Sequence, residues 1–563
     1  MGIIQPDSTI ILLKNIPLDP TYEHTICWEV DGAETLEMKL NRQTAYFTGA
    51  NAPKVLTLLS QTYTRLSKKK IRIEITTEST WAEIMKVNYM CFKNISFQGR
   101  WFYAFVTNVE YINNRVCEIE FELDVMQTWY FDYTLGMCFV EREHTTTDNL
   151  FENLVPENLE IGNTYISKHR TDYDLNEQKI CVLFGYPDET RPAIPSEWGD
   201  VINGIYSPIK RSVYDIPDRS DADYSQKIGN INYSIVAGIG SQNIIAIYQY
   251  PKLFEPDING EPISHEVVIP DNWTPQYQNA SIGNHIVRNK KLLTYPYNFI
   301  CVSNNAGQTA EYYFENWTKP AADSYKFYVK GVCVTQPVGI CYPHLYRGIT
   351  SDYEDGITMS NFPVCAWMGS AFKEWWAQNK NSFLTSNIAS ILGGYASTAT
   401  SVGVGAALGT IAAPEAAAII GGVGVGISTV TTVANAVAKI QDLKSAPPQL
   451  RGQVQSDCLN SALSRYVFSF YHLQIKQEFA EIIDDYFDRY GYACKRNKIP
   501  NRYARPYWCF TKTLDCNITA NDIPNTDIVK ICKIYNNGIT FWKWKSDPHT
   551  NLRVGDYTQN NQV

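Results

Sequence analysis

A long and almost uncharged segment dominates the second half of the sequence. From Asn381 to Ala438 the chain carries one charged residue, Glu415, and Gly, Ala, Ser, Thr, Val and Ile fill most of the remaining positions. The segment divides around Pro414 into two arms, 388–412 and 416–440. Each arm has about the 20 to 25 residues that a helix needs to cross a bilayer. This segment, which we call the apolar window, therefore predicts either a buried helical hairpin or a membrane-active one.

The composition of the window favours the membrane-active alternative. The rest of the chain is typical of β-sheet, so no helical bundle is predicted that the arms could join. Repeated glycines such as Gly421-Gly422 allow close helix packing in lipid but are unfavourable in a helix in water. Nine Val or Ile residues between Ala416 and Ile440 favour insertion by roughly 3 to 5 kcal/mol, which is marginal for a single copy. We therefore expect a segment that is sheltered first and inserted later.

The candidate site is accordingly a membrane-active loop with Glu415 at its tip. Protonation of Glu415 would ease its passage across a bilayer. The residues expected to contact lipid are Ile388, Ile391, Leu392, Val402, Val404, Leu408, Ile411, Ile419, Ile420, Val423, Val425, Ile427, Val430, Val433 and Val437.

Length and charge limit the class of protein. The chain has 563 residues, which predicts several domains. Charged residues make up 19% and aromatic residues 13%, with 37 Tyr, and this balance favours strands. The net charge of −9 argues against a protein that grips nucleic acid by its phosphates. It is compatible with a conduit that repels DNA from its lining.

Cysteine and histidine patterns predict no metal site and no cofactor. The 14 Cys residues are scattered without a CxxC pair, and the 8 His residues form no HExxH. Scattered thiols are typical of a chain that folds in a reducing cytoplasm, where Cys behaves as a small buried apolar residue. The first residues lack the basic and long apolar regions of a signal peptide. We expect synthesis in the cytoplasm and release by assembly or lysis.

Alternating apolar and polar residues predict strands through much of the chain. Short apolar or alternating runs occur at 9–14 and 71–76, and Trp101–Val125 reads as a hairpin that turns at Asn113-Asn114. Further strands are expected at 180–185, 243–250, 299–302, 326–334 and from Trp508 onward.

Helical spacing is found in fewer places. Residues 54–66 and 372–378 are predicted to be helical, and 471–490 carries a clear apolar stripe that ends before Gly491. The predicted fold is mainly β and multidomain, with barrel or sandwich domains at both ends. The predicted parts are an N-terminal β domain (1–150), one or more middle β domains (151–370), the apolar loop (371–455) and a C-terminal domain (456–563).

Several smaller clusters have both a structural and a functional interpretation. Glu478, Glu481, Asp484, Asp485 and Asp488 could serve a hydrolase or a cation, but we expect the solvated face of a helix. Glu141, Glu143 and His144 fit no site spacing and are expected at a strand end. The basic groups Lys68-Lys69-Lys70 and Lys495-Arg496 with Arg502 and Arg505 are expected on a solvated surface or in a subunit contact. The aromatic residues Tyr503, Tyr507 and Trp508 between them are also typical of single-strand binders.

Two long blocks carry a family resemblance. The first contains WFYAFVT, FELDVMQTW and VEREH between Trp101 and His144. The second runs IIDDYFDRYGYACKRNKIPN from Ile482 to Asn501 and continues with KTLDCNI and NNGITFWKW. Both resemble the tail-knob proteins of phi29-like short-tailed bacteriophages of Gram-positive hosts. The middle, from about 150 to 370, is not covered by this resemblance.

The resemblance implies a non-enzymatic structural protein of the virion tail tip. It implies a homo-oligomer of six copies that forms a tube with barrel-like first and last domains, joined to other tail proteins of the collar or proximal tail. It further implies that the hydrophobic loops plug the lumen and then leave it to form a channel in the host membrane. Viral DNA would pass through the lumen without sequence-specific binding.

Two alternatives remain open from the residues alone. A receptor-binding or adsorption protein would use the middle region to dock wall polymer and would expose many Trp and Tyr side chains. A wall-degrading enzyme would need paired carboxylates in a cleft. Only the pore-forming tail tip gives the apolar window a role.

Overall fold

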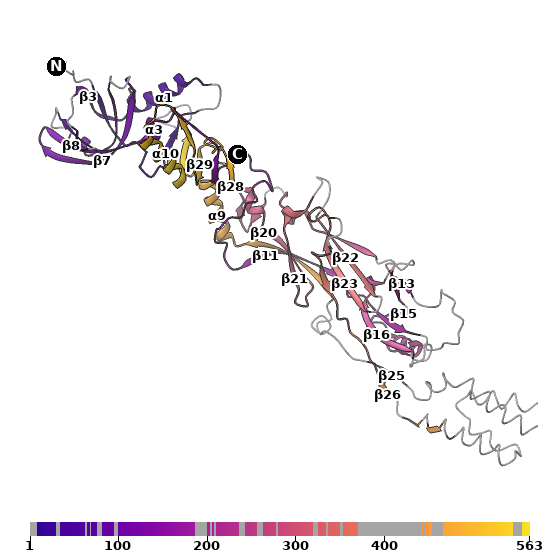
Figure 1. Ribbon diagram of the computed structural model, residues 1–563. Helices are drawn as coiled ribbons and strands as arrows, with labels where there is room; N and C mark the ends of the chain where they lie inside the picture. The colour runs from indigo at the N-terminus through magenta and orange to yellow at the C-terminus, as the bar shows by residue number, and fades with distance from the viewer. Residues whose placement is uncertain are drawn as a thin grey trace, which may run out of the picture. The chain divides into compact units, whose positions relative to one another are not determined.

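The computed structural model describes residues 8–543 and 554–563. Its gaps are 30–33, 62–64, 68, 76–80, 95–98, 186–199, 203–204, 208–209, 236–242, 256–262, 277–279, 319–324, 334–335, 350–352, 370–437, 439–440, 443–444, 447–448 and 453–465. The chain forms two compact units (Figure 1). Unit 1 comprises Met1–Lys168, Pro275–Phe299 and Leu473–Val563, and unit 2 comprises His169–Thr274 and Ile300–His472.

The largest sheet of unit 1 has seven strands. In spatial order they are β3 (Lys54–Gln61), β1 (Ser8–Lys14), β6 (Val87–Asn94), β7 (Trp101–Asn113), β8 (Val116–Leu123), β5 (Lys70–Glu74) and β4 (Arg65–Ser67). Three residues separate β3 from β4 in the sequence, although these strands form opposite edges of the sheet. Extended chain spans about 14 Å over that distance, whereas the edges of a flat seven-stranded sheet lie about 29 Å apart. The sheet must therefore curl into a barrel.

Strand alternation gives the barrel a different chemistry on each face. Side chains such as Leu12, Ile73 and Ile119 point inward and form one buried cluster. On the outer face, Tyr89 and Phe105 belong to a second cluster with residues of three helices. These helices are α1 (Leu36–Thr48), α3 (Val125–Thr128) and α10 (Asn525–Asn537), and a further short helix is α2 (Trp81–Ile84).

The second sheet of unit 1 joins segments from both ends of the sequence. Its order is β2 (Thr25–Cys27), β31 (Ile539–Lys543), β29 (Trp508–Thr513), β10 (Cys138–Glu143) and β28 (Tyr492–Lys498). Figure 1 shows β28 and β29 beside α9 (Gln477–Tyr490) and α10. Shorter elements are the pair β9 (Tyr133–Leu135) and β30 (Ile518–Ala520), the pair β18 (Ser281–Ile282) and β19 (His285–Ile286), and the 3₁₀ turn η7 (Lys290–Leu293).

Unit 2 is also built from sheets. One has the order β15 (Lys210–Asp215), β12 (Gln178–Phe184) and β16 (Ile244–Pro251), and another the order β17 (Ser264–Val268), β22 (Lys326–Cys333), β23 (Pro337–Pro343) and β24 (Ile357–Met359). The remaining elements are β13 (Asp200–Ile202), β14 (Ile205–Ser207), α4 (Tyr224–Tyr233), η5 (Lys252–Phe254), η6 (Asp271–Trp273), η8 (Phe314–Asn316), β25 (Trp367–Gly369) and β26 (Gln449–Arg451). The four-stranded sheet β11 (Tyr165–Asp174), β27 (Val467–Ile475), β20 (Asn298–Ser303) and β21 (Thr309–Tyr312) contains strands in which the chain passes from one unit to the other.

The β-rich multidomain fold predicted from the sequence is confirmed, and most predicted strands are present. Two predicted helices differ from the structure. Residues 54–61 form β3, because Leu58 points into the barrel while Leu59 is exposed, which is strand alternation and not a helical stripe. The helix predicted over 471–490 begins only at Gln477, because 467–475 form β27. The helical prediction for 372–378 lies outside the described residues.

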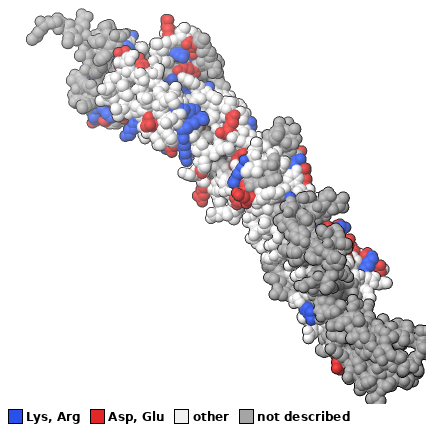
Figure 2. All heavy atoms as spheres, turned by 45° about the vertical axis from the view of Figure 1, so that its right-hand side comes forward, with Lys and Arg blue, Asp and Glu red and all other residues white. Residues whose placement is uncertain are grey.

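Charged side chains are sparse on the face of the molecule that Figure 2 shows. Figure 2 shows Lys, Arg, Asp and Glu singly or in small groups on an otherwise uncharged surface. This agrees with the low charged fraction of 19%. Most of the surface therefore offers polar and apolar contacts, with few ionic ones.

Candidate functional site

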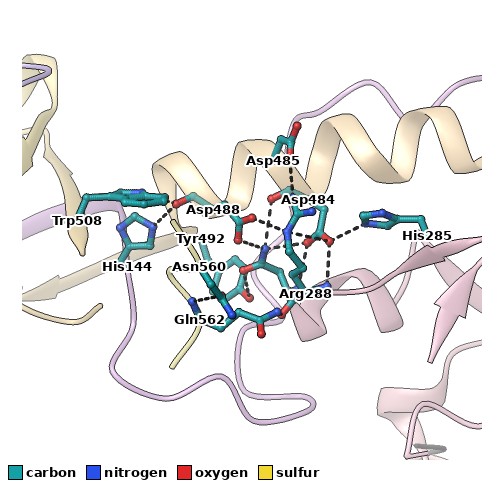
Figure 3. Close-up of polar contacts among 11 residues, drawn as sticks. His144, His285, Arg288, Asp484, Asp485, Asp488, Tyr492, Trp508, Asn560 and Gln562 are labelled. Atoms are coloured by element: carbon teal, nitrogen blue, oxygen red, sulfur yellow. Dashed lines mark hydrogen bonds and ion pairs between the residues drawn. The ribbon is translucent and has the colours of Figure 1, made fainter. Parts of the chain in front are cut away.

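A buried carboxylate network lies between α9 and the segment around β19. Asp484 is completely buried, and its carboxylate accepts hydrogen bonds from Nε2 of His285 at 2.8 Å and from the backbone N–H of Arg288 at 2.9 Å. The N–H of Asn289 donates to it at 3.0 Å, and its side-chain amide donates at 2.8 Å. Figure 3 shows Asp484 facing His285 and Arg288. Four donors therefore compensate for the burial of this charge.

Asp488, one turn further along α9, extends the network. It accepts from the side-chain amide of Asn289 at 2.7 Å and from Nε of Arg288 at 2.6 Å. Burial raises the pKa of the Asp488 carboxyl above its usual range, because desolvation penalises the charged form. Asn289 thus bridges the two carboxylates, and the spacing of four residues on a helix brings both to one face.

The expectation of a solvated carboxylate face on this helix is wrong for Asp484 and Asp488. It holds for Glu478 and Glu481, which are exposed, while exposed Asp485 pairs with Arg288. No local pattern in the sequence indicates this difference, because the partners lie almost 200 residues earlier. We call Asp484, Asp488, His285, Arg288 and Asn289 the α9 network.

A second buried carboxylate, Glu157, lies nearby in unit 1. Nζ of Lys291 lies 2.6 Å from Oε1 of Glu157, and the N–H of Ala493 donates to the same oxygen at 2.9 Å. Arg142 forms an ion pair with the other oxygen. Desolvation lowers the pKa of Lys291, although the nearby Glu157 opposes this shift. This group joins β10, β28 and η7.

Glu143 and His144 lie at the end of β10, as predicted. Glu143 is buried and forms an ion pair with Lys498. Nδ1 of His144 accepts from the N–H of Phe510 at 2.7 Å, and Nε2 donates to the carbonyl oxygen of Asp488 at 3.0 Å. Burial lowers the pKa of His144 to about 3, so the ring is neutral. Glu141, also on β10, pairs at 2.8 Å with Lys512 on the neighbouring strand β29.

Arg502 is not part of a solvated basic surface, which corrects the sequence interpretation for this residue. Its guanidinium carbon lies 5.4 Å from the ring centre of Tyr130, 5.9 Å from that of Tyr133 and 5.5 Å from that of Tyr503. Nη2 lies 3.4 Å from Oε1 of Glu29. Arg505 is also buried, whereas Lys495 and Arg496 are exposed. The planar cation therefore links the N-terminal segment to the C-terminal sheet.

These carboxylates are held by donors that belong to the fold. In the described residues, no group of three or more His, Cys, Asp or Glu is placed to hold a metal ion. The described cysteines are free thiols and are buried or partly buried. The geometry of the α9 network, of Glu157 and of Glu143 is that of structural ion pairs that connect distant segments.

The residues predicted to contact lipid lie outside the described residues, as does Glu415. The structure instead shows the two strands that flank segment 370–448, which contains the apolar window. In unit 2, β25 and β26 pair antiparallel, with Trp367 opposite Arg451 and Gly369 opposite Gln449. We call this two-stranded ladder the neck. Both ends of segment 370–448 therefore leave unit 2 side by side.

Trp367 anchors the neck in unit 2. Its ring is buried in a cluster with Val182 and Ile247. Gly452 packs against this ring with a positive φ of +80°, and a Cβ there would lie 2.2 Å from the ring. No pattern in the sequence predicted this neck, although Gly452 follows the window closely. Among the described residues, no helix is both long and apolar enough to span a bilayer.

Two parts of the chain match the models of known protein families. Residues 261–562 match the family model described as the C-terminal domain of the tail knob protein gp9 of Bacillus phage phi29. Residues 6–134, which include the barrel, match the family described as the N-terminus of the caudoviral major tail protein.

Full-length relatives and a solved structure agree with these matches. The tail knob protein gp9 of Bacillus phage B103 is 26% identical over 545 residues, covering 84% of this chain and 87% of the relative. That of Bacillus phage phi29 is 25% identical over 557 residues, covering 85% and 88%. The tail knob protein gp12 of bacteriophage C1 has a similar fold, with a TM-score of 0.57 and 13% identity over 97% of this chain and 98% of that one. The chain thus belongs to the family of the tail knob protein gp9 of phi29-like Bacillus phages and is a structural protein of a phage tail.

Proposed function

We propose that six copies of this chain form a tube at the tip of the tail, plugged by the apolar windows until infection. On infection the windows leave the tube and form a channel in the host membrane for the genome. The observation that carries this proposal is the neck, because β25 and β26 bring the residues that flank segment 370–448 together on a folded base. A segment of this length and composition needs shelter in a soluble particle, and a closed ring supplies it.

The charge distribution supports passage of DNA without binding. The outward side chains of β5 and β8 include Lys70 and Arg72, and both pair with Glu118, at 3.1 Å and 3.3 Å. Arg505 is buried, and the largely buried Arg502 is already paired with Glu29, so neither is readily available to phosphate groups. A net charge of −9 per chain would multiply in a ring and repel DNA from the wall.

The same surface chemistry suits assembly with other tail proteins. The match of residues 6–134 to a major tail protein domain supports a role for the barrel in tube formation. The proposed partners are further copies of this chain, other tail proteins of the collar or proximal tail, the host membrane through the windows, and the DNA in transit. We propose no catalytic activity, no metal and no cofactor.

The experiment that tests the function uses phage whose window is replaced at the neck. Gly369 and Gln449 are direct strand partners, so a two-residue Asn-Gly turn can replace residues 370–448 and close a regular hairpin. The particles are expected to assemble and to adsorb normally, and to fail in delivering DNA. Normal infection by this mutant would refute the channel. A shorter deletion, Thr385 to Ala438, serves as a second variant with the same expected result.

A further inference from the structure

The segment 554–563 packs on unit 1 although it contains no helix or strand of its own. The ring of Tyr557 meets Trp508 edge-on, with ring centres 5.1 Å apart, and Trp542, with ring centres 5.2 Å apart. The guanidinium carbon of Arg489 lies 4.6 Å from the centre of the Tyr557 ring. Tyr557 therefore contacts the last turn of α9 and two strands of the C-terminal sheet at once.

Asn561 makes the most specific contacts of this segment. Its side chain is buried, and its Oδ1 accepts from the N–H of Tyr507 at 3.0 Å and from that of Trp508 at 3.3 Å. Its Nδ2 donates to the carbonyl oxygen of Trp508 at 3.0 Å. A neighbouring strand would likewise accept a hydrogen bond from the backbone of one residue and donate one to it. The Asn561 amide therefore takes the place of a strand beside Trp508.

The next residue connects the segment to the α9 network. Nε2 of Gln562 donates to the carbonyl oxygen of Arg288 at 3.0 Å, and Figure 3 shows Gln562 beside Arg288. Arg288 in turn pairs with Asp488. By contrast Asn560 is exposed, and its side-chain oxygen accepts only a local hydrogen bond from the N–H of Gln562 at 3.0 Å. Neighbouring residues of the same chemical type thus differ completely in their contacts.

These contacts depend on side-chain identity and not on regular backbone pairing. Aspartate at position 561 would lack the donor for the Trp508 carbonyl, and Ala would leave three backbone groups of β29 and Tyr507 unsatisfied. Such dependence on an aromatic anchor and a buried amide is typical of peptide recognition.

We propose that Arg489, Tyr507, Trp508, Trp542 and the Arg288 carbonyl form a peptide-binding site for the chain's own segment 554–563, which acts as a strap. The strap fastens the end of α9 to β29 and to the loop that carries Arg288. It thereby keeps the α9 network in place in unit 1. Its release would free the backbone of Tyr507 and Trp508 and loosen the α9 network, while the barrel would remain folded.

The test compares Asn561→Ala with Asn560→Ala in the full-length chain by amide hydrogen exchange. In Asn561→Ala, exchange of the Tyr507 and Trp508 amides is expected to accelerate by about 10- to 100-fold, because their acceptor is lost. Amides of β1 in the barrel are expected to stay within about twofold of the unsubstituted chain. Asn560→Ala is expected to leave all of these rates unchanged.

Two results would overturn the strap. One is exchange of Tyr507 and Trp508 in Asn561→Ala that stays within about twofold of the unsubstituted chain. The other is an equal acceleration throughout unit 1, which would mean general destabilisation. A second variant, Gln562→Ala, keeps Asn561 and removes only the bond to Arg288. It is expected to accelerate exchange at Arg288 and Asn289 and to spare Trp508.

Discussion

Nε2 of His285 lies 2.8 Å from Oδ2 of Asp484, and this contact joins a short hairpin of the chain's middle to the principal helix near its end. Asp484 also receives the backbone donors of Arg288 and Asn289. Replacement of a buried carboxylate that accepts this many hydrogen bonds lowers the free energy of unfolding strongly, because all of its donors lose their acceptor at once.

Asp484→Ala is expected to destabilise unit 1 by about 3 to 5 kcal/mol. The control is Glu481→Ala, an exposed carboxylate on the same helix, which is expected to change stability by no more than about 0.5 kcal/mol. Urea unfolding followed by tryptophan fluorescence measures both. Equal effects of the two substitutions would mean that the α9 network contributes nothing specific.

Arg502→Lys is expected to cost about 1 to 2 kcal/mol, although the charge is kept. A lysine ammonium is not planar, so it cannot stack on the rings of Tyr130, Tyr133 and Tyr503 as the guanidinium does. Arg496→Lys is the matched control, because Arg496 is exposed on β28. Thermal unfolding of the two variants distinguishes a structural role of Arg502 from a general preference for arginine.

Two buried groups of unit 1, His144 and Asp124, are expected to change the stability with pH in opposite directions. The unfolded imidazole of His144 binds a proton near pH 6.5, whereas its folded pKa is about 3. Between these values the unfolded state binds more protons, so His144 makes the protein less stable as the pH falls, by up to roughly 1.4 kcal/mol per pH unit. His144→Gln should remove this loss.

Asp124 acts in the opposite direction. Desolvation by burial raises the pKa of its carboxyl to about 7, above the unfolded value near 4. The folded state therefore binds more protons between pH 7 and pH 4, and Asp124 makes the protein more stable as the pH falls. Asp124→Asn should remove this gain. Unfolding free energies at pH 7, 6 and 5 should thus rise towards low pH in His144→Gln and fall in Asp124→Asn, and parallel profiles would contradict both assignments.

The sequence predicted what depends on local pattern. The hairpin β7–β8 and strand β5 follow from alternation, and the C-terminal limit of α9 follows from Gly491, whose φ is +66°. The order of the barrel strands did not follow, because it depends on pairs that are distant in sequence, such as β1 with β6 and β5 with β8. The helix predicted over 54–66 is wrong for the same reason, because pairing with β1 places Leu58 and Leu59 on opposite faces of a strand.

The candidate sites show the same limit. The apolar window is recognisable from composition alone, since one charge in such a length is a local property. The neck and the α9 network are not, because each joins segments that lie far apart in the chain. Trp367 and Gly452, for example, become partners only when β25 and β26 pair.

Gly452→Ala is expected to loosen the neck, since a Cβ would collide with the Trp367 ring and the φ of +80° disfavours Ala. Hydrogen exchange of the β25 and β26 amides should increase by about tenfold, as for a local cost of about 1 to 2 kcal/mol. Gly229→Ala is the control, because its site in helix α4 is open and Ala favours a helix by about 0.5 to 1 kcal/mol. Unchanged hydrogen exchange of the β25 and β26 amides in Gly452→Ala would contradict the interpretation of the neck as a rigid base.

Leakage of dye from liposomes measures whether segment 370–448 acts on a membrane. The purified chain is compared with the variant in which an Asn-Gly turn replaces residues 370–448, and with Glu415→Lys, which places a permanent charge at the loop's tip. We expect leakage with the unsubstituted chain, reduced leakage with Glu415→Lys and none with the replacement, although both folded units remain intact in it. Equal leakage with and without segment 370–448 would contradict the claim that this segment is the part delivered to the membrane.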